Sequence, residues 1–181
     1  MGRNIFKPTI KTIAPKCLFG NWMILGGPSL DQDYELVWEA LSARVRPVAG
    51  LVRDRFGLGV EVRLGRPFRY WTAVELSPGA PVPAGMSQII IHSGLYLVLD
   101  KDPEVSLDEL YDFIYNFWED SRNELVVSRS RLCLEQYGPV GRQSKKVTLY
   151  APLANPAAQA KGTPSTPAEA DEAASIASFR Y

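Results

Sequence analysis

Two stretches of this chain repeat one order of elements, a strand, a helix and two further strands, and this repeat constrains the fold most. The segment LGVEVRLG at 58–65 resembles LCLEQYG at 132–138, and YWTAVEL at 70–76 resembles VTLYAPL at 147–153. Two such units side by side form an antiparallel sheet with both helices on one face and a groove at the join. The sequence therefore predicts an α+β fold whose central groove is suited to a ligand.

Each predicted helix begins at a serine that is followed three residues later by Gln or Glu. Ser29 and Gln32 form this capping-box pattern before the first helix, and Ser106 and Glu109 form a clearer one before the second. Apolar residues at helical spacing then predict the buried stripes, which are Tyr34, Val37, Trp38, Leu41 and Val45 in the first helix and Leu107, Leu110, Ile114, Phe117 and Trp118 in the second. Segments bounded by Gly and Pro predict further strands at 17–25, 88–91, 95–99, 131–137 and 147–151.

The composition changes after the last predicted strand. From residue 154 the chain is rich in Ala, Pro, Ser and Thr, which offer little apolar surface to offset the entropy cost of ordering. We therefore expect one folded domain over 1–153, made of units at about 8–84 and 85–153, and a flexible tail over 154–181.

Charge and cysteine content exclude several classes of protein. Lys and Arg number 20, as do Asp and Glu, so no net field favours binding to DNA or to a membrane surface. Cys17 and Cys133 lie in apolar contexts that suit small buried residues better than a disulfide, which fits a reducing cytoplasm. No window approaches the roughly 20 apolar residues that a membrane span requires.

Motifs for metal and nucleotide chemistry are missing. His92 is the only histidine, so a zinc site built on histidines is excluded, and we expect His92 to be a structural strand residue. Gly57-Leu-Gly59 lacks the third glycine of a dinucleotide loop, because Val62 stands at that position. We predict no metal and no cofactor.

Glu135 is the most informative polar residue, because it stands inside an otherwise apolar strand between Leu134 and Tyr137. A buried carboxylate requires a partner. Aromatic rings around a carboxylate suit an amphipathic cation, since each ring face contributes about 0.5–2 kcal/mol. The predicted ligand-binding residues are Glu135, Tyr70, Trp71, Tyr96, Trp118, Tyr137 and Trp38.

These segments together resemble a known family, the GyrI-like small-molecule-binding domain. This domain is also the effector-binding half of AraC-type and multidrug-responsive transcription regulators. The resemblance covers about residues 8–153. It is carried by Tyr-Trp-Thr-Ala-Val-Glu-Leu at 70–76, Val-Pro-Ala-Gly-Met at 82–86, Ile-His-Ser-Gly-Leu-Tyr-Leu-Val-Leu at 91–99, the helix at 110–118 that ends in Trp, Leu-Glu-Gln-Tyr at 134–137, and Leu-Tyr-Ala-Pro at 149–152.

The resemblance implies a SOUL-like pair of βαββ units related by a pseudo-twofold axis. It also implies a central groove for hydrophobic, often cationic, compounds, with Glu135 facing the ligand. His92-Ser93 replaces the usual Pro-Ala of the family, and Leu99 and Leu134 replace aromatic residues. No helix-turn-helix fits before residue 8, so a role in transcription regulation would require a protein partner.

Three functions stay open at this point. The first is a stand-alone module that binds an amphipathic, cationic or aromatic compound for sensing or sequestration. The second, implied by the resemblance, is a hydrolase of strained-ring aromatic natural products, with Glu135 as general base and Tyr96 or Tyr137 orienting the substrate. The third is a protein interaction, such as gyrase inhibition or a homodimer.

Overall fold

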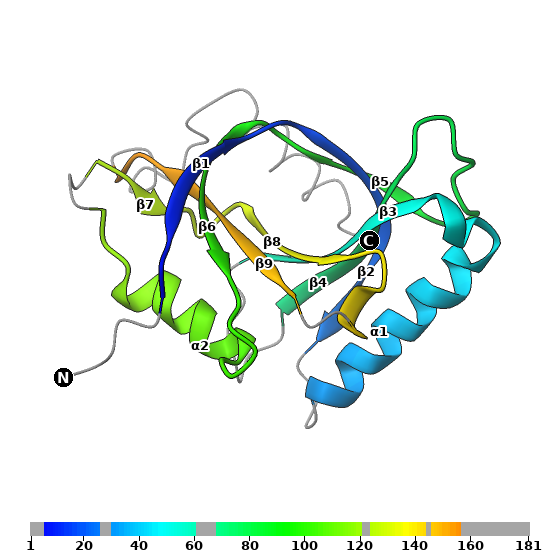
Figure 1. Cartoon of the computed structure of the whole chain (residues 1–181), viewed down its shortest axis with the longest axis horizontal. Coiled ribbons are helices and arrows are strands. Elements are labelled where there is room, and N and C mark those ends of the chain that lie inside the picture. Colours follow the sequence, from blue (N-terminus) through cyan, green and yellow to red (C-terminus); the bar gives the residue numbers. More distant parts are fainter. Residues whose placement is uncertain (1–5, 26–29, 61–67, 121–123, 144–145, 157–181) are drawn as a thin grey trace.

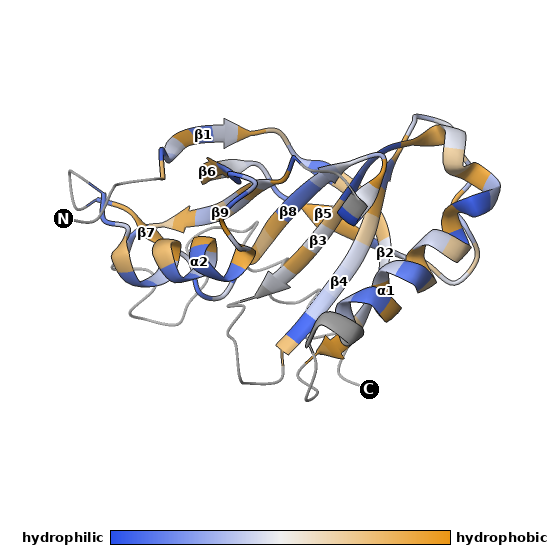
Figure 2. Ribbon diagram, turned by 60° about the horizontal axis from the view of Figure 1, so that its bottom comes forward, coloured by the Kyte–Doolittle hydropathy of each residue, from blue (hydrophilic) through white to orange (hydrophobic). Residues whose placement is uncertain are grey.

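The computed structural model of the chain describes residues 6–25, 30–60, 68–120, 124–143 and 146–156. One curled antiparallel sheet has the strand order β1-β6-β9-β8-β3-β4-β2-β5, and β7 pairs with β9. Helices α1 and α2 lie on one face of this sheet (Figure 1, Figure 2). The strands are β1 (Thr9–Ile13), β2 (Lys16–Leu25), β3 (Val52–Val60), β4 (Phe68–Leu76), β5 (Ser87–Ile91), β6 (Gly94–Asp100), β7 (Val126–Val127), β8 (Leu132–Gly138) and β9 (Thr148–Ala154).

The sheet is built from two βαββ units, as predicted. The first unit comprises β2, α1 (Leu30–Val45), β3 and β4, and the second comprises β6, α2 (Leu107–Asp112), β8 and β9. Strands β3 and β8 pair at the centre and join the units. The units also exchange edge strands. Strand β1 precedes the first unit in the chain but pairs with β6 of the second, and β5 precedes the second unit but pairs with β2 of the first.

The pairing registers locate the pseudo-twofold axis. At the edges, the cross-strand pair Lys16–Ile91 of β2 and β5 corresponds to the pair Gly94–Ile13 of β6 and β1. Near the centre, the pair Gly57–Thr72 of β3 and β4 corresponds to the pair Glu135–Leu149 of β8 and β9. Gly57 and Glu135 are therefore equivalent positions, and they lie directly opposite each other in the β3–β8 pair. The axis passes between these two residues.

This register corrects the repeat predicted from the letters, which matched 58–65 with 132–138 and so placed Glu61 against Glu135. The counterpart of Glu135 is Gly57. The predicted and observed alignments differ by four residues. Because side chains repeat every two residues along a strand, an even shift of this kind keeps the same face and matches the letters almost as well.

Helix α1 buries the predicted stripe against the sheet. Val37, Trp38, Leu41 and Val45 are buried and Tyr34 is half-buried. The hydroxyl of Thr72 on β4 donates to the carbonyl of Val37 at 3.4 Å and fixes the helix on the strand. The polar residues Glu35, Glu39, Ser42 and Arg44 of α1 are exposed. A 3-10 turn, η1 (Arg46–Leu51), continues the helix into β3. The capping serine predicted at position 29 lies outside the described residues.

Helix α2 begins with the predicted capping box. The hydroxyl of Ser106 accepts from the backbone N–H of Glu109 at 3.2 Å, and the Glu109 carboxylate accepts from the backbone N–H of Ser106 at 2.7 Å. After Asp112 the helix widens into a π-helical turn, η2 (Phe113–Phe117), closed by the bond from Trp118 N–H to Phe113 C=O.

The π-helical turn corrects the predicted apolar stripe of the second helix. Phe117, which was expected on the buried face, is 69% exposed. The wider turn adds a residue and rotates the following side chains relative to an α-helix. Trp118 instead packs against the core.

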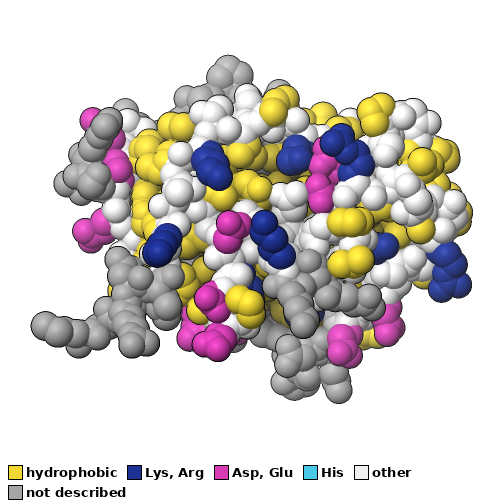
Figure 3. All heavy atoms as spheres, viewed as in Figure 1, with side chains coloured by type: hydrophobic (Ala, Val, Ile, Leu, Met, Phe, Trp, Pro, Cys, Tyr) yellow, Lys and Arg dark blue, Asp and Glu magenta, His cyan; other side chains and the backbone are white. Residues whose placement is uncertain are grey.

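Apolar side chains cover both faces of the sheet. Two clusters fill the space between the sheet and the helices, and a third lies on the opposite face around Phe56, Leu58 and Trp71. Cys133 is buried as predicted, whereas Cys17 is exposed and accepts a hydrogen bond from the side-chain amide of Gln88 at 3.2 Å. Acidic and basic side chains are interspersed on the face that Figure 3 shows.

The other predicted strands are confirmed, with ends that shift by up to three residues. The strands expected at 17–25, 88–91, 95–99, 131–137 and 147–151 correspond to β2, β5, β6, β8 and β9. Strand β9 ends at Ala154, one residue beyond the predicted domain boundary, and residues 157–181 of the predicted tail lie outside the described part of the chain. None of the described helices is both long and apolar enough to cross a membrane.

Candidate functional site

Glu135 lies at the centre of the molecule, on the face of β8 that the helices cover. Side chains alternate along a strand, so Cys133, Glu135 and Tyr137 point toward the helices while Leu132 and Leu134 join the opposite cluster. The Glu135 side chain has no exposed surface. A carboxylate in this position requires polar partners within the core.

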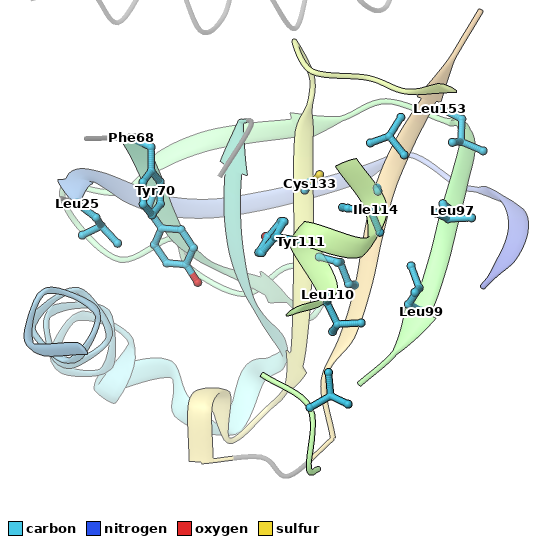
Figure 4. Close-up of a cluster of buried hydrophobic side chains, with 14 of the residues drawn as sticks. Leu25, Phe68, Tyr70, Leu97, Leu99, Leu110, Tyr111, Ile114, Cys133 and Leu153 are labelled. Carbon is cyan, nitrogen blue, oxygen red and sulfur yellow. The ribbon is translucent and has the colours of Figure 1, made fainter. Parts of the chain in front are cut away.

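Three tyrosine hydroxyls supply these partners. Tyr70 on β4 and Tyr137 on β8 each donate to Oε2 of Glu135 at 2.6 Å, and Tyr111 on α2 donates to Oε1 at 2.8 Å. Tyr70 and Tyr111 reach toward each other from opposite sides of the central strands (Figure 4). We call Glu135 with these tyrosines the carboxylate–tyrosine cluster.

Gly57 makes the contact between Tyr70 and Glu135 sterically feasible. It lies on β3, between the strands that carry these two residues, and pairs directly with Glu135. A Cβ atom at position 57 would overlap the Tyr70 hydroxyl and would lie 2.5 Å from Oε2 of Glu135. Gly57 therefore provides the room over the central strand that the Tyr70 side chain occupies.

Burial raises the pKa of each tyrosine in the cluster well above its ordinary value. The second cause in all three cases is the negative charge of Glu135, which opposes a phenolate nearby. At neutral pH the hydroxyls are therefore protonated donors. For Tyr137 the positive charge of Arg142 acts in the opposite direction and lowers the pKa.

A second layer of rings surrounds the carboxylate–tyrosine cluster. Tyr34 packs edge-on against Tyr70 with ring centroids 4.9 Å apart, and Trp38 packs edge-on against Tyr137 at 5.0 Å. On the α2 side, Tyr115 stacks parallel to Tyr111 at 6.2 Å. The site therefore combines one carboxylate with aromatic side chains from both units.

The structure brings together some of the predicted ligand-binding residues and separates others. Glu135, Tyr70, Tyr137 and Trp38 lie together on the helix-covered face, and Trp118 packs at the edge of the core beneath α2. Two predicted residues, Trp71 and Tyr96, belong to the cluster on the opposite face of the sheet. The Tyr96 hydroxyl donates to the carbonyl of His92 and accepts from Arg131, away from Glu135.

Tyr111 was missed in the sequence. Its spacing was informative, because it follows Leu107 by one helical turn and precedes Ile114 by nearly another, which places it on the buried stripe. Its neighbour Leu110 also fits this stripe, so spacing alone does not distinguish the two residues. A tyrosine on a buried stripe requires a hydrogen-bond partner, and that partner is Glu135.

Within the described part of the chain, no group of three or more His, Cys, Asp or Glu residues is arranged to hold a metal ion. The carboxylate–tyrosine cluster offers one carboxylate and three neutral hydroxyls. It therefore combines hydrogen-bond donors with one carboxylate and aromatic rings, and offers no second acid or base.

No protein-family model and no curated protein sequence matches the chain. Several solved structures match its architecture. An integron cassette protein from Vibrio cholerae aligns with a TM-score of 0.56 and 15% identity, over 82% of this chain and 97% of that one. The EcmrR C-terminal domain aligns with a TM-score of 0.63 and 13% identity, over 83% of this chain and 99% of that one.

A third solved structure is SAV2435 bound to tetraphenylphosphonium. It aligns with a TM-score of 0.55 and 14% identity, over 82% of this chain and 94% of that one. This chain shares its fold with these proteins. At these identities the likeness establishes the architecture, and the helix-covered sheet described above agrees with a GyrI-like fold.

Proposed function

We propose that this protein binds a hydrophobic organic cation and that Glu135 provides the countercharge. One observation carries the proposal. Glu135 has no exposed surface and accepts hydrogen bonds from three neutral hydroxyls, and no lysine or arginine of the described residues forms an ion pair with it.

Hydrogen bonds and charge compensation are different requirements. The tyrosine hydroxyls occupy lone pairs of the carboxylate, but they carry no net charge. A buried charge without a counter-ion is unfavourable by several kcal/mol. A cation that is itself weakly hydrated loses little on leaving water, and the surrounding rings attract it through their negative faces. Such a ligand therefore supplies what the cluster lacks.

The solved structures of the same fold support this proposal. SAV2435 was determined with tetraphenylphosphonium, a hydrophobic cation, and the EcmrR C-terminal domain belongs to a protein whose full chain was determined on DNA. This chain covers 59% of that full EcmrR chain. We infer a sensing or sequestering role in the cytoplasm.

The hydrolase alternative receives less support from the geometry. A general base must be able to accept a proton from water, whereas the Glu135 oxygens already accept hydrogen bonds from three tyrosine hydroxyls. Tyr96, one of the residues expected to orient a substrate, lies in the cluster on the far face of the sheet. A binding role requires no proton transfer by Glu135. The protein-interaction alternative stays a prediction from the resemblance.

Replacing Glu135 with Gln tests the proposed function. The amide keeps the shape of the side chain but removes its charge, so binding of a cationic rhodamine should weaken by about 1–3 kcal/mol. Binding of a neutral rhodamine lactam of similar size should change little. Fluorescence titration of both dyes against the wild type and the variant measures the difference.

Glu75→Gln is the matched control, because it removes the same charge from the opposite face, where Glu75 pairs with Lys16 at 2.9 Å. Its affinity for the cationic dye should equal that of the wild type. Equal losses for both dyes in the Glu135 variant, or no loss for either, would remove Glu135 from the ligand site. Hydrolysis of the dye or of an electrophilic aromatic compound, detected by mass spectrometry and abolished by Glu135→Gln, would favour the enzyme instead.

A further inference from the structure

A continuous path of ring contacts leads from Glu135 to the surface on the α1 side. Tyr70 donates to Glu135, Tyr34 packs edge-on against Tyr70, and the guanidinium of Arg142 lies over the Tyr34 ring at 4.7 Å from its centroid. Arg142 belongs to the short turn η3 (Gly141–Gln143), which follows β8 and lies beside α1 (Figure 1). Its side chain is exposed.

A similar path leads to an arginine on the α2 side. Tyr111 donates to Glu135, Tyr115 stacks on Tyr111, and the guanidinium of Arg129 lies 5.2 Å from the centroid of Tyr115. Two arginines thus flank the buried carboxylate, each separated from it by a pair of tyrosines. The guanidinium groups of Arg142 and Arg129 therefore lie on opposite sides of Glu135, and neither forms an ion pair with its carboxylate.

The two arginines differ in how firmly they are held. Arg129 is half-buried and donates to the backbone carbonyl of Tyr115 at 3.0 Å, which fixes it to the helix that it covers. Arg142 is exposed and lies on the half-buried ring of Tyr34. Its charge nevertheless reaches the cluster, because it opposes the rise in the pKa of Tyr137. Arg142 is therefore the arginine that a ligand can displace.

We propose that Arg142 is a specificity-determining residue, which supplies part of the countercharge of Glu135 in the free protein and competes with a cationic ligand for it. This inference rests on the proposed function. A ligand that approaches along Tyr34 meets a like charge first, so only a cation with enough apolar surface to replace the arginine on the ring gains access. Small, strongly hydrated cations are thereby excluded.

Arg142→Gln tests the competition. The affinity for the cationic rhodamine should increase by about fivefold, which corresponds to about 1 kcal/mol, while the affinity for the neutral lactam should stay the same. Arg142→Lys keeps the charge and should retain most of the discrimination of the wild type. Arg53→Gln is the control for net charge, because Arg53 lies near Glu75, 4.0 Å from its carboxylate, outside the cluster. It should leave both affinities unchanged.

A measurement without ligand separates this inference from the proposed function. If Arg142 compensates Glu135 in the free protein, Arg142→Gln should lower the urea midpoint of unfolding more in the wild-type background than in the E135Q background. This coupling is expected even if no rhodamine binds, so a failure of the proposed function leaves it testable. Additive effects in this double-mutant cycle would overturn the role of Arg142, as would a cation affinity in Arg142→Gln that equals that of Arg53→Gln or falls below the wild type.

Discussion

Gly57 and Glu135 show how much one missing side chain contributes to the site. They are equivalent residues of the two units, yet one carries a carboxylate and the other carries only hydrogen. The empty space over Gly57 is what the Tyr70 side chain crosses to reach Glu135. The site therefore depends on a residue that contributes no functional group.

Gly57→Ala should destabilise the protein by about 1–3 kcal/mol, the usual cost of adding volume to a packed core. The added methyl group would overlap the Tyr70 hydroxyl and crowd Oε2 of Glu135. Urea unfolding followed by circular dichroism measures this loss. In a Tyr70→Phe background the loss should be smaller, because the overlapping oxygen is gone.

Gly50→Ala is the matched control for this glycine. A Cβ atom at position 50 meets no atom within 4 Å, so the substitution should change the free energy of unfolding by less than about 0.5 kcal/mol. An equal loss for both variants would indicate that the effect of Gly57→Ala comes from backbone flexibility and not from the site.

At the scale of elements, α2 is the short helix on which the cluster depends. It has 6 residues before the π-helical turn, and it carries Tyr111 to the carboxylate. A helix this short is not stable alone, so its capping box and its packing hold it in place. The start of α2 therefore affects a site near its end.

Ser106→Ala should lower the free energy of unfolding by about 1 kcal/mol at neutral pH, because the N-cap hydroxyl is lost. The Ser106 backbone N–H and then its hydroxyl lower the pKa of Glu109. The stability from this interaction is therefore present above the ordinary glutamate pKa and is lost as the pH falls through the lowered value.

Thermal unfolding at several pH values between 7 and 3 checks the pH dependence. The difference between the wild type and Ser106→Ala should be largest at neutral pH and should shrink in acid. Ser93→Ala, which changes an exposed serine between β5 and β6, is the control and should show no such trend. A constant difference at all pH values would contradict the role of the Glu109 carboxylate.

The positions of the helices and strands were largely predictable from the sequence, whereas the face of the sheet on which each side chain lies was not. Gly and Pro punctuation and the Ser106 capping box located the strands and α2, but β1 was missed because its alternating Thr and Ile residues are mostly exposed and belong to no apolar run. Trp71 and Tyr96 could be assigned to strands, yet the face that each occupies depends on register and on the cover given by distant helices. The π-helical turn after Asp112 leaves no recognisable signal in the sequence.

At the scale of the whole molecule, the domain closes with β9. This strand pairs with both β6 and β8, so it ties the end of the described chain to the centre of the sheet. Residues 157–181 are rich in Ala, Pro, Ser and Thr and offer little apolar surface for a core. We expect the fold to be independent of them.

Truncation after Pro156 should leave the melting temperature nearly unchanged. Truncation after Thr148 removes most of β9 and should abolish cooperative unfolding, because the pairing with β6 and β8 is lost. Differential scanning calorimetry of both shortened chains and the full chain measures these effects. A large decrease in the melting temperature after the first truncation would mean that the segment from 157 contributes to the fold.

The position of the pseudo-twofold axis has a consequence for charge. If each unit were a separate chain in a symmetric dimer, the residue beside the axis would occur twice, and a glutamate there would face its own copy about 5 Å away. Two acids at that separation cannot both ionise, so such a pair holds one proton between them. Because both units belong to one polypeptide, the two positions differ: a single carboxylate, that of Glu135, lies beside the axis and Gly57 lies opposite. Fusion into a single chain thus permits one unduplicated carboxylate at the centre of a nearly symmetric scaffold.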